Sequence, residues 1–415
     1  MKSLWKQSIG CVAAFLLAAA SAQAGPSLFS PLAADGPVRQ ALKLDASYHA
    51  LAGSPATESL RLVQARPALL TEKAVSLDLD LGLGFGLRVH RTDAYRVRSG
   101  NLVWVGIIEN PSAVRVPFSA ETVEFEPMNQ VVLVRNGGRI TGNLHFNGDW
   151  YKIRPLRTGG HAVVKVKPSG MPADHPADYA DLPVIGMPET PERAVGDTVI
   201  NVMVHYTQGA AAASGDINGL IDLAVAESNV GYDNSGVTID LVLVHKSQVT
   251  YTESSFSTDL SRYRTPGDGY MDAIHTTRDS VGADVGLLVI NNASSCGLAS
   301  SIGSTAATAF ADAHWDCITG YYSFAHEIGH LQSARHDPKN DPTNTPYAWG
   351  HGYQYTTNPK WRTIMAYNCT GGGCPRLNFW SNPGVLYNGK PMGTTTKNDN
   401  HRVLNDTRAT VAAFR

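Results

Sequence analysis

Residues 326–337 have the sequence "HEIGHLQSARHD", and the interpretation of the whole chain starts from this stretch. It holds three histidines, His326, His330 and His336, and one glutamate, Glu327. In a helix, side chains four residues apart project side by side, so His326 and His330 would share one face. The apolar residues of the same region fall on the other side, where a core can bury them. The pattern predicts a helix that offers two imidazoles to a cleft.

His336 can join the other two histidines only if this helix ends. A continuous helix would place it about 15 Å along the axis from His326, so we expect the chain to fold back near Ser333. Three protein ligands leave one position of a zinc ion open for water, as in catalytic sites, whereas closed structural sites use four. Glu327 is then placed to take the proton of the attacking water and pass it to the departing amine. The sequence predicts one catalytic Zn²⁺ ion held by His326, His330 and His336, with Glu327 as general base.

The length and charge of the chain limit the other possibilities. Its 415 residues suffice for two domains, and 43% of them are hydrophobic. The formal net charge of −2 argues against a nucleic acid partner.

Residues 1–24 have the pattern of a signal peptide. Lys2 and Lys6 precede an apolar stretch at 9–20, and Ala22-Gln23-Ala24 forms a small-x-small cleavage site before Gly25. The apolar stretch is shorter than the roughly 20 residues that span a bilayer. We therefore expect a secreted protein, extracellular or periplasmic, with no membrane span.

Four cysteines remain beyond the signal peptide. Cys369 and Cys374 bracket "TGGG" and are expected to close a tight loop, which leaves Cys296 to pair with Cys317. Thiolate ligands to zinc are a poor alternative, because the spacing fits no zinc-knuckle pattern.

The first half of the chain, residues 25–195, is rich in strand signals. "SLDLDLGLG" alternates with period two, "NLVWVGII" is an apolar run, and Asn147-Gly148 favours a two-residue hairpin turn. The glycines of "LGLGFG" are expected in a strand rather than a phosphate loop, because no lysine-serine pair or helix follows them.

A segment rich in Pro, Asp and Ala, residues 168–197, is interpreted as a linker. Beyond it, strand and helix patterns alternate, which favours a sheet packed by helices over a sandwich.

The zinc stretch, with its third histidine, resembles the metzincin motif H-E-x-x-H-x-x-G-x-x-H. "TIMAY" at 363–367 resembles the methionine turn of that clan. Within the clan, the chain resembles the bacterial peptidyl-Asp metalloendopeptidases and, more distantly, the reprolysin-like proteases. The likeness covers roughly residues 197–415, and it extends weakly to 151–166, which resemble part of a reprolysin-type propeptide.

The resemblance implies an α/β (α+β) metzincin-like catalytic domain over 196–415, with a mixed, mostly parallel sheet and packed helices. A β-rich propeptide over 25–195 would precede it. The resemblance implies a zinc metalloendopeptidase that acts on proteins and peptides. Met365 is expected to form a packing floor beneath the histidines. Tyr367 matches a tyrosine that some metzincins place near the metal, where it binds the ion, bonds the developing oxyanion or only packs.

The glycine that ends the helix in this family is Ser333 here. A left-handed turn costs a non-glycine residue about 1–2 kcal/mol. The turn either shifts to a neighbour or accepts this strain, and we expect lower stability or metal affinity than with glycine.

Two alternatives stay open at this stage. A glutamate from a later helix is excluded as third ligand, because Glu327 is the last glutamate in the chain. Asp337 can still replace His336 as the third ligand. The alternative function is an exported binding or adhesion module with a retained metal site. His314 and His351, the nearest other histidines, are expected to be ordinary surface or core residues.

The segment after the methionine turn lines the pocket for the residue that follows the cut bond in metzincins. Here it contains Arg376, and Arg362 is a second candidate, so a peptidyl-Asp likeness implies pairing with an acidic side chain. A solvated surface arginine is the alternative.

The propeptide itself is the expected inhibitor of the precursor. It has no cysteine to bind the zinc ion, so Asp149 of "FNGD" and His175 of the linker are the two candidates for this role.

Overall fold

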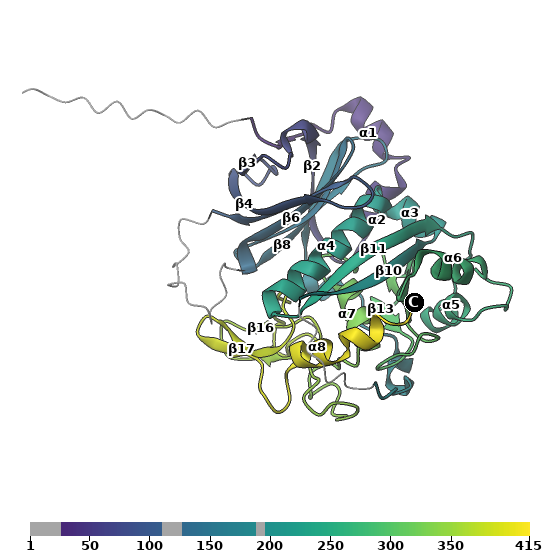
Figure 1. Ribbon diagram of the computed structural model, residues 1–415. Coiled ribbons are helices and arrows are strands. Elements are labelled where there is room, and N and C mark those ends of the chain that lie inside the picture. The colour runs from purple at the N-terminus through teal and green to yellow at the C-terminus, as the bar shows by residue number, and fades with distance from the viewer. Residues whose placement is uncertain (1–25, 110–126, 188–195) are drawn as a thin grey trace, which may run out of the picture.

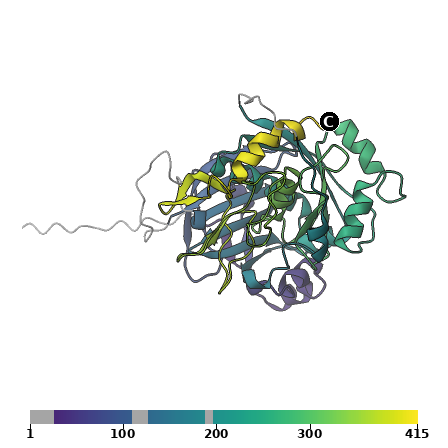
Figure 2. The ribbon, with the colours of Figure 1, turned by 90° about the horizontal axis from the view of Figure 1, so that it is seen from below.

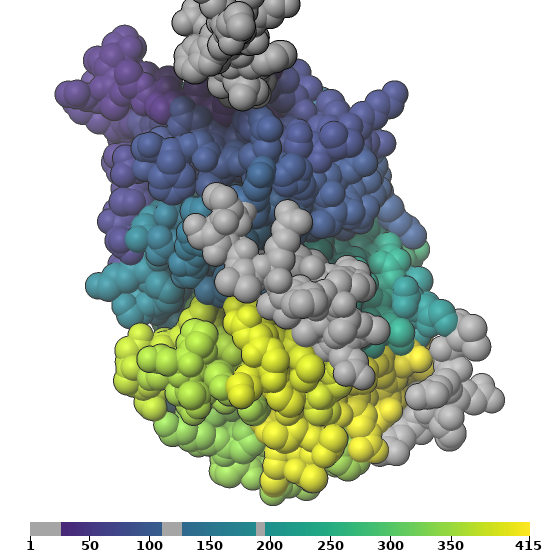
Figure 3. Space-filling model, turned by 90° about the vertical axis from the view of Figure 1, so that its left-hand side faces the viewer, coloured from purple at the N-terminus to yellow at the C-terminus, as the bar shows by residue number. Residues whose placement is uncertain are grey.

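The computed structural model describes residues 26–109, 127–187 and 196–415. The expected signal peptide and its cleavage site before Gly25 lie outside these residues. The described chain has two large β-sheets on opposite sides of a long helix, α4 (Ile217–Ser235), and two small two-stranded sheets (Figure 1). In Figure 3, the N-terminal sheet and the C-terminal segments occupy opposite ends of one face of the molecule.

The first sheet has nine strands, all paired antiparallel, in the order β1-β2-β9-β8-β7-β6-β5-β4-β3. The helices α1 (Gly36–Leu42) and α2 (Ala46–Ala52) lie between its first two strands in the sequence. The β-rich N-terminal region that the sequence predicted is therefore present. Its strands are β1 (Phe29–Pro31), β2 (Thr57–Ala65), β3 (Ser76–Leu79), β4 (Leu87–Arg96), β5 (Leu102–Ile108), β6 (Gln130–Asn136), β7 (Arg139–Phe146), β8 (Asp149–Pro155) and β9 (His161–Val166).

Two local expectations for this sheet have opposite outcomes. The β7–β8 hairpin is confirmed, since Phe146 pairs with Asp149 and both Asn147 and Gly148 have positive φ, as a type I′ turn needs. The expectation of a strand through "LGLGFG" is wrong. Strand β3 ends at Leu79 and β4 begins at Leu87, because Gly82 and Gly84 adopt positive φ and turn the chain.

The apolar run in β5 is explained by burial on both faces of the sheet. Leu102 and Trp104 point into a core formed within the N-terminal region. Val103 and Val105 point the other way and pack against Leu223 of α4, among other residues. Because side chains alternate between the faces of a strand, a strand covered on both sides is apolar throughout.

The second sheet has five strands in the order β11-β10-β12-β14-β13. The pairs β10–β11, β10–β12 and β12–β14 are parallel, and the edge strand β13 is antiparallel to β14. The strands are β10 (Thr198–Tyr206), β11 (Ile239–Gln248), β12 (Val285–Ile290), β13 (Gly297–Ala299) and β14 (Phe310–His314).

Helices cover both faces of this second sheet. On one face lie α5 (Phe256–Arg264) and α6 (Ala273–Val281), which Figure 2 shows grouped at one side of the molecule. The other face packs against α4, α7 (Ser323–Leu331) and α8 (Asn400–Val411). The remaining elements are α3 (Gln208–Ser214), β15 (Gln354–Tyr355), β16 (Trp361–Arg362), β17 (Asn382–Tyr387) and β18 (Lys390–Met392). Within the described ranges, no helix has the length and apolar character needed to cross a membrane.

The segment interpreted as a linker is placed along the edge of the second sheet. After η3 (Pro168–Gly170), Ala173 forms a parallel bridge with Ser295, just before β13. After η4 (Ala177–Asp181), Val184 forms a second parallel bridge with Ile302. The segment therefore runs beside α7, the helix that carries His326 and His330.

Candidate metal centre

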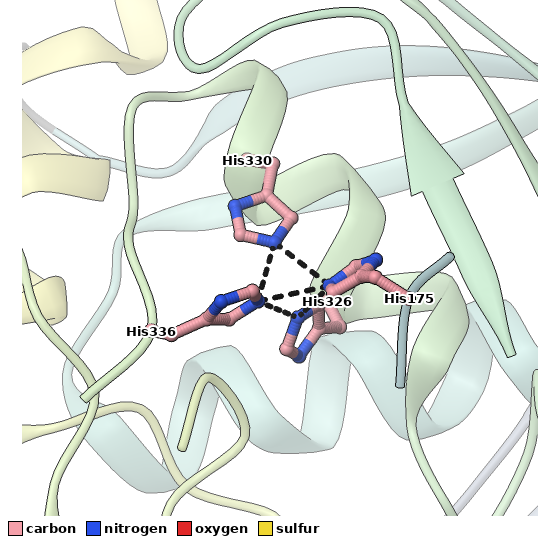
Figure 4. A group of neighbouring side chains, drawn as sticks. All are labelled: His175, His326, His330 and His336. Carbon is pink, nitrogen blue, oxygen red and sulfur yellow. Dashed lines mark hydrogen bonds between the residues drawn. The ribbon is translucent and has the colours of Figure 1, made fainter. Parts of the chain in front are cut away.

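Four buried histidines converge at the end of α7. They are the three predicted from the sequence, His326, His330 and His336, together with His175 from the segment along β13 (Figure 4). One ligand atom from each lies within 4.8 Å of the others. We refer to these residues as the four-histidine cluster.

The end of α7 brings His336 back to the helix. Ser333 adopts φ +74°, its N–H donates to the carbonyl of His330, and the N–H of Ala334 donates to the carbonyl of Gly329. These two bonds form a Schellman motif, in which the residue in the left-handed conformation is usually glycine. The turn has therefore accepted the strain at Ser333 and has not moved to a neighbour.

Backbone carbonyls orient three of the imidazoles. Nδ1 of His326 lies 2.9 Å from the carbonyl oxygen of Ile364, and Nδ1 of His330 lies 2.8 Å from that of Ala334. Nδ1 of His175 lies 2.9 Å from the carbonyl oxygen of Gly297. A carbonyl can only accept, so each Nδ1 carries the proton and each Nε2 presents its lone pair to the cluster.

Burial also keeps these rings neutral. It lowers the pKa of His326, His330 and His336 well below the usual value, and it lowers the pKa of His175 to about 4. Metal binding requires the neutral form of imidazole.

The spacing of the four Nε2 atoms fits a tetrahedral metal ion. Five of the six Nε2–Nε2 separations run from 2.9 Å, for His175 to His336, to 3.3 Å, for His330 to His175, and the sixth is within 4.8 Å. A tetrahedral ion with nitrogen ligands at about 2.0–2.1 Å separates them by about 3.3–3.4 Å. Lone pairs that face one another at this distance repel unless a cation lies between them. Imidazole nitrogens suit zinc and other divalent transition metals.

Glu327 lies beside the cluster and is almost completely buried, with 1% of its surface exposed. Its Oε1 lies 3.8 Å from Nδ1 of His175, and its Oε2 has no hydrogen-bond partner among the described residues. Burial, followed by the charge of Asp174, raises the pKa of Glu327 well above its usual value. The carboxylate packs against Gly297, where a Cβ atom would collide with it, so this position of β13 needs glycine. A carboxyl group with a raised pKa and a free oxygen is suited to proton transfer.

Met365 and Tyr367 both lie next to the histidines. Met365 is fully buried, and a Cβ atom on Gly329 of α7 would lie 3.1 Å from its sulfur. The ring of Tyr367 is 4.2 Å from the ring of His336, centre to centre. Burial first, and then the charge of Asp174, raise the pKa of Tyr367, which favours the neutral phenol.

The other polar candidates near the cluster have separate partners. Asp337 accepts hydrogen bonds from the side chain of Asn340 and from the backbone N–H of Tyr367, and it is not part of the cluster. His351 lies with Nδ1 2.7 Å from the carbonyl oxygen of His336, so it positions that backbone. His314 packs against Trp315.

Two arginines bind a carboxylate close to the cluster. Arg376 lies 2.9 Å from Oδ2 of Asp174, and Arg362 lies 3.6 Å from the same oxygen. Both guanidinium groups also lie over the ring of Tyr321, at 4.3 and 5.4 Å from its centre. Burial would raise the pKa of Asp174, but Arg376 and Arg362 hold it below the usual value. Neither arginine is a solvated surface residue, since both are buried. We call Arg362 and Arg376 the arginine pair.

Asp174 was not expected from the sequence, and His175 was one of two candidates for blocking the metal. The other candidate, Asp149, lies in the β7–β8 hairpin, where its carboxylate pairs with Lys165 at 3.2 Å and its side chain is 46% exposed. Asp149 is therefore not part of the cluster. The sequence around His175 offers only an aspartate-histidine pair in a proline-rich segment, 151 residues before His326.

Both disulfides join the cysteines that the sequence paired. Cys296 is bonded to Cys317, and Cys369 to Cys374. The first of these bonds connects the residue before β13 to the loop that precedes α7.

Comparison with known proteins agrees with this geometry. The family described as Metallo-peptidase family M12 matches residues 196–381. A peptidyl-Asp metalloendopeptidase of Stenotrophomonas maltophilia (strain R551-3) is 46% identical over 424 aligned positions, which cover 100% of this chain and 99% of the relative. A protein of the same name from Xanthomonas campestris pv. campestris is 44% identical over 425 positions, with 98% of each chain covered. A third, from Pseudomonas fragi, is 48% identical over 190 positions, which cover 46% of this chain and 100% of the relative.

The relatives from Stenotrophomonas maltophilia and Xanthomonas campestris match almost the whole chain, including the β-rich N-terminal region. Their names describe enzymes, so the alternative of an adhesion module is not supported. The chain therefore belongs to metallopeptidase family M12, among the peptidyl-Asp metalloendopeptidases, and it is a metalloendopeptidase.

Proposed function

We propose that the chain is a secreted zinc endopeptidase that cuts peptide bonds next to acidic residues, with His326, His330 and His336 as zinc ligands and Glu327 as general base. The observation that carries this proposal is the convergence of three imidazole Nε2 atoms beside a buried carboxyl group that has one oxygen free. A bound zinc ion supplies Lewis-acid polarisation of the peptide carbonyl and lowers the pKa of its water to about 7.

The chain's own residues supply the proton transfers. Glu327 takes a proton from the attacking water on its free Oε2 and returns it to the nitrogen of the departing amine. The imidazoles of His326 and His330 are held in one tautomer by backbone carbonyls, so they remain fixed during the reaction. The ring of Tyr367 lies 4.2 Å from that of His336, so its neutral phenol would be a hydrogen-bond donor available to negative charge that develops on the substrate.

The arginine pair supports a preference for acidic residues. Arg376 and Arg362 already bind one carboxylate, that of Asp174, in a buried position within reach of the cluster. Guanidinium groups bind carboxylates with charge-assisted hydrogen bonds. The names of the relatives, peptidyl-Asp metalloendopeptidase, fit an aspartate at this position of the substrate. The two disulfides fit an oxidising compartment, which supports secretion.

Metal content and casein hydrolysis of the matured enzyme test the mechanism. We expect one zinc ion per chain in the wild type and in Glu327→Gln, with turnover lower by about 10²–10⁴-fold in the variant. His330→Ala is the control, in which both metal and activity are lost. Casein clearing by Glu327→Gln at the wild-type rate would contradict the role of Glu327.

Cleavage-site profiling on a peptide library tests the specificity. Arg376→Ala should lose the preference for acidic residues, because an incoming carboxylate then meets only Arg362. Arg402→Ala, a half-exposed arginine on α8, is the matched control and should keep the wild-type profile. An undiminished acidic preference in Arg376→Ala would remove Arg376 from this role.

A further inference from the structure

Asp174 and His175 lie in the metal site although they precede the region that matches the M12 family, residues 196–381. They belong to the chain that runs from the N-terminal sheet to β10 and passes along the edge strand β13. A cut after His175 and before β10 would separate both residues from the catalytic sheet.

His175 has the position of a fourth metal ligand. Its Nε2 lies 3.0 Å from Nε2 of His326, 2.9 Å from that of His336 and 3.3 Å from that of His330 (Figure 4). The ring is buried and its Nδ1 donates to the carbonyl of Gly297. Four imidazoles complete a tetrahedral shell, so no position is left for the water that attacks the substrate.

Asp174 places a carboxylate where an acidic substrate side chain would bind. Its Oδ2 contacts Arg376 at 2.9 Å and Arg362 at 3.6 Å, while Arg376 also donates to the carbonyls of Tyr321 and Ala366. The side chain of Asp174 is only 8% exposed at this site. The contact therefore offsets one of the two positive charges of the arginine pair, and the Asp174 carboxylate occupies the place that an acidic substrate side chain would take.

Backbone hydrogen bonds hold the two carbonyls that precede His175 against the edge of the second sheet. The N–H of Cys296 donates to the carbonyl of Ala173 at 2.8 Å, and the N–H of Gly297 donates to the carbonyl of Asp174 at 3.2 Å. The carbonyl of the Asp174–His175 bond is thus engaged by β13. The imidazole of His175, and not a carbonyl, reaches the cluster.

We propose that Asp174 and His175 form a two-residue plug, in which His175 supplies the fourth ligand of the metal ion and Asp174 fills the acidic-residue pocket formed by Arg362 and Arg376. The proposal rests on the function proposed above, because it needs the three-histidine metal site. It also assigns Arg362 to substrate recognition, since both arginines contact the same carboxylate oxygen. The plug keeps the precursor inactive, and cleavage beyond His175 allows it to leave.

Cobalt substitution of the uncut precursor tests the His175 contact without measuring turnover. Glu327→Gln is introduced into the full chain to prevent self-cleavage, and Co²⁺ replaces the native metal. The visible spectrum should show a four-nitrogen tetrahedral site that does not respond to added acetohydroxamate, a small metal-binding probe. In His175→Ala the site opens, and the spectrum should change and saturate with the probe.

Two further variants make this test specific. His175→Cys restores a fourth ligand and should add a thiolate-to-cobalt charge-transfer band, which a merely structural residue would not produce. Asp149→Ala, in the same N-terminal region, should match the parent. A parent spectrum that responds to the probe as strongly as His175→Ala does, or the absence of a thiolate band in His175→Cys, would overturn the role of His175.

The Asp174 contact is tested in the same background. Asp174→Ala should respond to acetohydroxamate at concentrations that leave the parent spectrum unchanged, because the plug loses its buried ion pair. Asp174→Glu retains the charge and should respond less than Asp174→Ala. If the Asp174→Ala precursor responds to acetohydroxamate no more than the parent does, the proposed role of Asp174 is wrong.

The outcome for the plug is separable from that for the proposed function. A precursor that binds one metal ion but has an open site contradicts the plug alone, and the matured enzyme then still hydrolyses casein. A precursor and matured chain that bind no stoichiometric metal contradict the metal centre, and the plug with it.

Discussion

Ser333 shows how one residue at a helix end controls the metal site. With φ +74° it adopts the conformation that a glycine would take without strain, and the reversal it permits delivers His336 to the cluster. Its hydroxyl is buried and has no hydrogen-bond partner among the described residues. Both the backbone strain and the unpaired hydroxyl destabilise the folded state.

Ser333→Gly should therefore stabilise the protein. Relief of the strain, about 1–2 kcal/mol, exceeds the greater entropy of glycine in the unfolded chain, about 0.5–1 kcal/mol. We expect a net gain of about 1 kcal/mol in the free energy of unfolding, measured by urea denaturation of the Glu327→Gln precursor. Ser333→Ala removes the hydroxyl but keeps the strain and should gain less. Equal stability of wild type and Ser333→Gly would show that the turn is not strained.

At the scale of elements, α7 depends on its close contact with the loop that contains Met365. Gly329 lies on the side of α7 that faces this loop, and a Cβ atom there would lie 2.7 Å from the ring of Trp380 and 3.1 Å from the sulfur of Met365. The neighbouring carbonyl of Ile364 accepts the hydrogen bond from His326. The same contact thus packs the helix and orients a metal ligand.

Gly329→Ala should weaken both packing and metal binding. Overpacking of a filled core costs about 1–3 kcal/mol, and displacement of α7 from this loop would disturb the bond from His326 to Ile364. Competition with a chelator measures the zinc affinity, which we expect to fall. Gly36→Ala in α1 is the matched control, because a Cβ atom there meets nothing within 4 Å. Unchanged affinity in Gly329→Ala would contradict this coupling.

Strand β8 holds the N-terminal sheet to the C-terminal half of the described chain through buried charge. Nζ of Lys152 lies 2.8 Å from the carboxylate of Asp316, with 2% and 9% of these side chains exposed. Next to it, Arg154 donates to Thr319, and Asn143 of β7 donates to Glu227 of α4. Burial lowers the pKa of Lys152, and the charge of Asp316 acts against this effect.

Lys152→Ala should destabilise the precursor by about 3 kcal/mol, because it leaves Asp316 buried without its partner. Chemical denaturation of the full chain measures this change. Lys165→Ala in β9 is the control and should have a much smaller effect, because its partners Glu58 and Asp149 are about half exposed. Similar losses in both variants would contradict the importance of the buried pair.

At the scale of the whole molecule, a bound metal ion would join the two regions of the chain. His175 precedes β10, whereas His326, His330 and His336 lie on and after α7, so one ion would bind residues up to 161 positions apart. A ligand that binds only the folded state stabilises it by mass action.

Removal of the metal should therefore lower the melting temperature of the Glu327→Gln precursor. Calorimetry with and without a strong zinc chelator measures the shift, and added zinc should reverse it. His326→Ala, which lacks a ligand, should show little response to the chelator. A melting temperature unaffected by the chelator in the parent protein would contradict a metal that joins the two regions.

Much of the local structure could be predicted from the sequence, because short-range geometry depends on a few neighbouring residues. The spacing of His326 and His330 places them on one helical face, and the Asn147-Gly148 pair forms the expected hairpin. The likeness to a metzincin motif supported His336 as the third histidine of the site, and the structure places His336 in the four-histidine cluster. The strand expected through "LGLGFG" was wrong, because periodic hydrophobicity did not reveal the positive φ of its glycines.

The contacts of Asp174, His175 and Arg362 depended on tertiary structure. Asp174 and His175 lie in a segment whose own sequence has no catalytic pattern, and their contacts with Arg362 and the cluster form only when β13, α7 and β16 pack together. Spacing along the chain constrains neighbours through bond geometry, but it carries no information on which distant segment covers a sheet edge. The position of residues 168–187 along the sheet edge is determined by the core around the second sheet. Burial of apolar side chains and pairing of backbone hydrogen bonds favour this one placement.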